Sequence, residues 1–281
     1  MLALGLGLIA ALCWGVHDVC VRKVSQDTPL MASLMTVLVA GTVFQLLLML
    51  GTGGFATIPT PALGFSMLSG VCFLMASIGL YLAFKRGPVR LVAPIIASYP
   101  ILSVAWAAAR GVQIGLFEWT AVLTIVVGVS IVAVLSDDGT DDVPPKARTI
   151  FYAFIASIGF GSTFAIGQFA TESAAHLPVA FVTRITSIVL LFAIMIALRL
   201  PLWPGRAALP VLAIMGCLDG IALMSVLSAG GLPNAQYAAV TSSVFGLLTI
   251  VMAWMFLKER MTAAQWGGVA LSFAGIGYLA L

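Results

Sequence analysis

The sequence predicts an all-α integral membrane protein with ten transmembrane helices, arranged as two inverted five-helix repeats. Of its 281 residues, 62% are hydrophobic and only 8% are charged, whereas a soluble domain carries about 25% charged residues. The mean hydropathy is +1.15, so lipid is the solvent for most of the chain. A helix needs roughly 20 apolar residues to cross a bilayer, and such segments fit about ten times into this length.

Glycines, prolines and charged residues separate the apolar segments and set the ends of the predicted helices. The first five helices are predicted at residues 2–21, 30–50, 61–84, 91–109 and 116–136. The second five are predicted at residues 149–170, 178–199, 208–229, 235–257 and 263–281. The acidic linker 137–148 divides the chain into a first repeat, 1–136, and a second repeat, 149–281. In the fourth helix, Pro94 and Pro100 remove backbone donors and predict a kink.

The two halves are weakly similar, which indicates an internal repeat. The stretch ALCWGVHD (11–18) resembles SIGFGSTF (157–164), and each contains an aromatic residue followed by glycine. Trp119 and Trp266 occupy matching places at the start of the last helix of each half. Because five is an odd number, the second half enters the membrane from the opposite side. This pattern is typical of inverted-repeat transporters.

The distribution of Lys and Arg predicts the orientation in the membrane. The connections after the odd-numbered helices carry eleven of the thirteen basic residues, leaving Arg110 on the other side and Arg184 within a helix. Since basic residues gather in the cytoplasm, these connections and the linker are predicted to be cytoplasmic and both termini outside, in a cell (inner) membrane. The first apolar run has no basic leader and no clear cleavage site, so we expect a retained helix.

Composition and motifs argue against several other functions. A net charge of +3 is too small to indicate nucleic-acid binding. The four cysteines lie in apolar runs without metal or redox spacing, and the two histidines form no HExxH motif. Neither a G-x-S-x-G motif nor a nucleotide-binding loop is present. We therefore expect neither an enzyme nor a bound cofactor or metal.

Two stretches resemble a known family. LCWGVHDVCVRK (12–23) is similar to the first-helix signature of the drug/metabolite transporter superfamily. Residues 242–281, with the Lys-Glu-Arg turn at 258–260, resemble the end of its EamA-type ten-helix transporters. The resemblance implies a small-molecule transporter, often an exporter, with termini more commonly in the cytoplasm. In that family an Arg often lies early in the second helix of each repeat, and Arg184 matches it; the first repeat has Met35 there. The first repeat also has AAARGVQIG (107–115) in place of the Glu-Arg turn.

Asp219 is the strongest candidate site residue, because an ionisable group within the membrane usually marks a substrate or ion path. It is the only charged side chain within residues 210–231. At about 1.5 Å per residue it lies roughly 16 Å deep, and Arg184 lies at a depth only about 5 Å different. The two residues are predicted either to form a structural ion pair or to handle substrate or protons, and an ion pair that opens during transport satisfies both interpretations.

Other polar residues reach a similar depth. Ser98 and Tyr99 lie in the fourth helix, and Ser242 and Ser243 lie in the ninth. They are predicted either to bind substrate or to form hydrogen bonds between neighbouring helices.

A gate is predicted nearer the cytoplasm. Asp18 is predicted about 6 Å deep, where it either pairs with Arg22 four residues later or forms a gate with His17, since histidine as a residue type can change charge near neutral pH. Trp14 lies one turn deeper and either lines the cavity or packs in the core. On the opposite side, Asn234 and Tyr237 are predicted near the mouth of the path.

The last predicted helix carries the small residues Ala264, Gly268 and Ser272 at intervals of four. Such a stripe lets helices approach closely, either within the chain or between two copies in a homodimer.

The predicted function is that of a secondary transporter of a small polar metabolite, such as an amino acid or an amine, by alternating access, with proton-coupled export as one mode. Charges of both signs at one depth suit a zwitterion or an amine. The alternatives are an uncoupled facilitator or exchanger and, less favoured, an integral-membrane enzyme.

Overall fold

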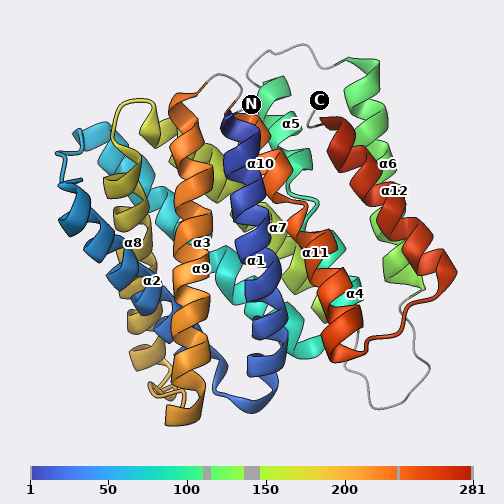
Figure 1. Ribbon diagram of the computed structural model, residues 1–281, viewed down its shortest axis with the longest axis horizontal. Coiled ribbons are helices and arrows are strands. Elements are labelled where there is room, and N and C mark those ends of the chain that lie inside the picture. Colours follow the sequence, from blue (N-terminus) through green and yellow to red (C-terminus); the bar gives the residue numbers. More distant parts are fainter. Residues whose placement is uncertain (1, 110–114, 136–145, 233–234, 280–281) are drawn as a thin grey trace.

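The computed structural model describes residues 2–109, 115–135, 146–232 and 235–279, and within these ranges all regular secondary structure is helical (Figure 1). The helices of the first half are α1 (Leu2–Asp27), α2 (Leu30–Thr52), α3 (Thr60–Arg86), α4 (Val89–Ile96), α5 (Pro100–Ala109) and α6 (Leu116–Val134). Those of the second half are α7 (Lys146–Thr171), α8 (His176–Ala197), η1 (Arg206–Ala208), α9 (Leu209–Ser228), η2 (Ala229–Gly231), α10 (Gln236–Ser242), α11 (Phe245–Met252), η3 (Ala253–Leu257) and α12 (Ala263–Leu279).

The predicted all-α membrane fold is confirmed. Among the described residues, seven helices are long and apolar enough to cross a membrane, and Val89–Leu102 and Leu116–Val132 are shorter apolar helices. Large apolar side chains face outward, including Leu47, Val189 and Ile214, each more than half exposed. Exposing so large an apolar surface to water is unfavourable, so this surface faces lipid. The chain is therefore a multi-pass membrane protein.

Two of the predicted helices are broken near their centres: the break in 91–109 agrees with the predicted kink, whereas the break in 235–257 corrects the prediction of a continuous helix. The first break, at residues 97–99, separates α4 from α5, because Pro100 has no N–H with which to continue the ladder. The second break, at residues 243–244, separates α10 from α11. There the hydroxyls of Ser242 and Ser243 donate to the carbonyls three residues earlier, and the backbone tightens into i−3 bonds.

Both breaks lie in the fourth membrane helix of their half, as an internal repeat requires. The packing repeats in the same way: α3 packs on α7 as α9 packs on α1, and α2 packs on α9 as α8 packs on α3. The fifth helices, α6 and α12, pack on each other. Helix α1 begins and α12 ends at the same end of the bundle (Figure 1).

Glycine allows the helices of the two halves to approach closely. A Cβ atom built on Gly216 of α9 would lie 2.5 Å from the carbonyl oxygen of Val37 in α2, and one built on Gly41 would lie 2.5 Å from the carbonyl oxygen of Gly216. Likewise, a Cβ atom on Gly159 of α7 would lie 2.8 Å from the backbone nitrogen of Ala76 in α3. In lipid, such backbone contact supplies the dispersion energy that holds helices together.

The small-residue stripe of α12 contributes to the same kind of packing. Gly268 and Ser272 lie against Gly128 of α6 within the chain, whereas Ala264 is exposed. The alternative of internal packing is therefore observed for two of the three residues. A homodimer through this helix stays a prediction.

Candidate functional site

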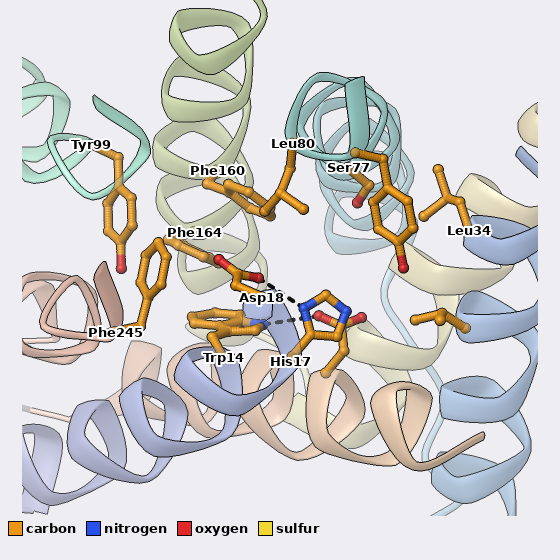
Figure 2. A pocket seen from close by; sticks show the side chains of 13 residues that line it. Trp14, His17, Asp18, Leu34, Ser77, Leu80, Tyr99, Phe160, Phe164 and Phe245 are labelled. Carbon is orange, nitrogen blue, oxygen red and sulfur yellow. Dashed lines mark hydrogen bonds and ion pairs between the residues drawn. The ribbon is translucent and has the colours of Figure 1, made fainter. Parts of the chain in front are cut away.

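A small cavity, of about 20 Å³, lies at the centre of the bundle, between the two halves of the chain (Figure 2). Side chains from α1, α2, α3, α7, α9 and α11, and from the break between α4 and α5, surround it. The lining residues are Trp14, His17, Asp18, Leu34, Val37, Ser77, Leu80, Tyr81, Tyr99, Phe160, Phe164, Asp219 and Phe245. Its polar lining is well buried, since Asp18 is 1% exposed and His17 4%. The protein therefore shields these polar groups from solvent.

Asp219 lines this cavity and pairs with Arg184. Arg184 Nη2 lies 2.5 Å from Asp219 Oδ2, so the similar depths predicted from the sequence are matched by direct contact. The other carboxylate oxygen, Oδ1, accepts a hydrogen bond of 2.9 Å from the indole Nε1 of Trp14. Both oxygens of Asp219 are thus occupied by donors of this chain.

Arg184 itself lies behind the cavity wall. Its side chain is fully buried, with the guanidinium carbon 5.6 Å from the centre of the Phe73 ring and Nη1 close to Gly41. Glycine at position 41 makes this possible, because a Cβ there would lie 2.5 Å from Nη1. The guanidinium thus acts on the cavity through Asp219, whose charge it balances.

The two helix breaks are joined by a hydrogen bond across the centre of the protein. The Tyr99 hydroxyl lies 2.5 Å from the hydroxyl of Ser242, so the break of the first half is tied to that of the second. Ser98 lies near Ser157, with its hydroxyl donating to Ile95 O, while Ser243 bonds Val240 O. Of these candidate residues only Tyr99 lines the cavity. The hydroxyls of the three serines donate hydrogen bonds to backbone carbonyl groups.

Asp18 lies in the central cavity together with Asp219, whereas the sequence predicted a separate layer nearer the cytoplasm. Because α1 continues to Asp27 rather than ending near residue 21, Asp18 is about 14 Å from the end of its helix, at roughly 1.5 Å per residue. It lines the same cavity as Asp219, and its Oδ1 accepts a 2.9 Å hydrogen bond from His17 Nδ1. The prediction of an Asp18–Arg22 pair is wrong, since Arg22 donates to Phe84 O and contacts Glu259.

Aromatic rings form much of the remaining wall, and sequence reasoning had identified only two of them. The ring of Trp14 stacks on Phe164 with centroids 5.3 Å apart and lies 6.3 Å from Phe160. Tyr99 packs against Phe164 and Phe245. The internal repeat could have identified Phe160, because it occupies the position in the second-half stretch that Trp14 occupies in the first. Of the gate residues predicted for the other mouth, Asn234 and the side chain of Tyr237 lie outside the described residues.

The face rich in Lys and Arg is closed by a cluster of charged side chains, which we call the basic-face cluster: Arg22, Arg90 and Glu259. The carboxylate of Glu259, from the turn after η3, accepts hydrogen bonds from the backbone N–H groups of Val89 and Arg90 at the start of α4. Arg22 Nε lies 3.7 Å from the same carboxylate. Arg90 Nη1 donates to the carbonyl oxygen of Arg260. One carboxylate of the second half thus holds two helices of the first.

Glu259→Gln should loosen this closure, because the amide loses the charge that strengthens both caps and the ion pair. If opening becomes easier by about 1.4 kcal/mol, a reporter in the cavity becomes accessible about tenfold more often. The reporter is Ser77→Cys in a background with the native cysteines replaced, labelled by a membrane-impermeant maleimide. Faster labelling from the basic face alone is the expected result. Glu118→Gln, at an exposed carboxylate of α6, is the control, and equal rates in all three proteins would contradict the closure.

Comparisons with known proteins agree with this architecture. The model of the EamA-like transporter family matches the chain twice, at residues 1–134 and 147–281. An uncharacterized transporter from Archaeoglobus fulgidus is 21% identical over 283 residues, covering 100% of this chain and 99% of the relative. A solved crystal structure with 16% sequence identity superposes with a TM-score of 0.76 over 99% of this chain and 98% of the other, and it shares the fold.

Proposed function

Because the chain belongs to the EamA-like transporter family, we propose that it is a secondary transporter that carries a small polar metabolite, of the amino acid or amine class, across the cell membrane. The observation that carries the proposal is the central cavity, which combines two carboxylates and a histidine with aromatic walls between the two halves. Ionisable groups kept in the membrane interior are costly, and their usual role is to handle a solute or an ion.

Alternating access requires that the cavity open to each face in turn, and the broken helices supply places to bend. The breaks at 97–99 and 243–244 adjoin the cavity and are joined by the Tyr99–Ser242 hydrogen bond. Bending at one break opens the basic face after the basic-face cluster separates, and bending at the other opens the opposite face. In the proposed orientation the basic face is cytoplasmic and the termini lie outside.

Coupling to protons is part of the proposal. Asp219 and the His17–Asp18 pair are the ionisable groups that line the cavity. A proton taken up by these groups from one side and released to the other exchanges for solute, which drives export against a gradient.

Flux into proteoliposomes tests both the transport and the coupling. Purified protein is assayed with a panel of amines and amino acids, with and without a pH gradient. Asp219→Asn should lower the pH-driven flux at least tenfold, while Asp27→Asn, at an exposed carboxylate of the same bundle, should leave it unchanged. Wild-type flux that follows only the solute gradient would indicate a facilitator. Coupled flux that Asp219→Asn does not change would remove this residue from coupling.

A further inference from the structure

We infer that the carboxylate that binds the solute is Asp18, not Asp219, and that its ligand is an organic ammonium group. This inference rests on the proposed function, and it narrows the solute class from amino acids and amines to amines. It follows from an account of which polar atoms around the cavity already have partners and which do not.

Asp219 already has a donor of this chain on each carboxylate oxygen, and one of these donors is a cation. Its Oδ1 is taken by Trp14 Nε1 at 2.9 Å and its Oδ2 by Arg184 Nη2 at 2.5 Å. Arg184 is fully buried beside Phe73 and Gly41, so its positive charge stays with the carboxylate. A second cation at Asp219 would meet the repulsion of this guanidinium. We therefore assign Asp219 a positioning role, as the acceptor that fixes the Trp14 indole in the cavity wall.

Asp18 is in the opposite situation. Its Oδ1 accepts from His17, but its Oδ2 is buried without a hydrogen-bond partner among the described residues. Two donors or acceptors beside the same cavity, His17 Nε2 and the Tyr81 hydroxyl, are likewise buried and unpartnered. A buried carboxylate oxygen without a donor is expensive, and a ligand that brings a charged N–H removes this cost.

The walls around Asp18 suit a cation that carries apolar groups. Trp14, Phe160 and Phe164 present rings to the same cavity, and Figure 2 shows them around the Asp18 and His17 side chains. Aromatic faces attract ammonium groups electrostatically and also accept the apolar body of an amine. Once the cavity widens to admit it, an alkylammonium or arylalkylammonium ion therefore meets a carboxylate and a ring face in one place.

The same account disfavours a free carboxylate on the solute. The guanidinium that could hold it, that of Arg184, is separated from the cavity by Asp219 and does not line it. A zwitterion would thus bring its negative end among two carboxylates, where the His17 ring and the Tyr81 hydroxyl offer donors but no paired cation is available to it.

Binding to purified protein in detergent tests the assignment without requiring transport. Benzylammonium is the probe, with the neutral isostere benzyl alcohol and the zwitterion phenylglycine as comparisons, and tryptophan fluorescence or thermal stabilisation reports binding. Wild-type protein should bind benzylammonium at least tenfold more tightly than either comparison. Asp18→Asn should abolish this preference, and Asp18→Glu should restore most of it. Asp27→Asn, an exposed carboxylate of the same helix, should retain it fully.

Three outcomes would overturn the assignment: equal binding of the neutral probe, equal binding of phenylglycine, or an unchanged preference in folded Asp18→Asn. Folding of each variant is checked by its elution volume and by its unfolding temperature without ligand. The proposed function fails separately, through the absence of flux in proteoliposomes. Binding of benzylammonium without flux would support the amine site at Asp18 and contradict the transport function. Flux of amines that does not depend on Asp18 would support the transport function and contradict the assignment of Asp18.

Discussion

The Arg184→Met variant should unfold at a much lower temperature than the wild-type protein, with a loss of about 3–5 kcal/mol in the free energy of unfolding. Arg184 is fully buried, and it is the only cation in direct contact with the Asp219 carboxylate among the described residues. Methionine fills a similar space but leaves that carboxylate uncompensated. Thermal unfolding of the detergent-solubilised protein, followed by circular dichroism, measures the effect.

The double variant Arg184→Met/Asp219→Asn distinguishes loss of charge balance from loss of packing. If the uncompensated charge is the cause, removing it should recover a large part of the lost stability, and the two substitutions should be strongly non-additive. A single variant as stable as the wild type would show that the ion pair is not what holds α8 to α9.

The second large effect is expected at a helix contact that contains no charge. Gly216→Ala should destabilise the protein by about 1–3 kcal/mol, the usual cost of overpacking. The added methyl would lie 2.5 Å from the carbonyl oxygen of Val37 and 2.8 Å from the backbone nitrogen of Gly41. Because backbone atoms cannot rotate away, α2 and α9 must separate.

Gly64→Ala is the matched control for this prediction. Gly64 also lies within a membrane helix, α3, but a Cβ there would meet nothing within 4 Å. The same substitution should be neutral or slightly stabilising at this position, since alanine favours the helix more than glycine does. Equal unfolding temperatures for the two variants would show that the close contact of α2 and α9 is not limiting.

The fold was predictable from the sequence because a bilayer fixes the length of a helix and disfavours polar residues within it. The pairing of Arg184 with Asp219 was also predictable, since helix rise alone converts residue numbers into depth. Depth arguments depend on where a helix ends, however. Charged residues after Val21 were taken as the end of the first helix, but Arg22 is satisfied by Phe84 O and Glu259 and the helix continues to Asp27. Asp18 was therefore not placed in the same cavity as Asp219.

Contacts between segments that are distant in the sequence could not be predicted from helix lengths and depths. Nothing near Trp14 in the sequence indicates that its indole bonds Asp219, which lies 205 residues away. The break at 243–244 contains no proline or glycine and depends on serine hydroxyls that bond backbone carbonyls. Such local competition with the helix ladder is weak, and only tertiary packing decides whether it succeeds.

The way the two halves interlock has a consequence for how the protein moves. Helices α2 and α3 of the first half each pack closely on α9 or α7 of the second, with backbone touching backbone at their glycines. Neither half can swing as one block against the other without separating these contacts. In the proposed transport cycle, the displaced elements are therefore the segmented helices and the outer α6–α12 pair, which turn against a frame formed by helices of both halves.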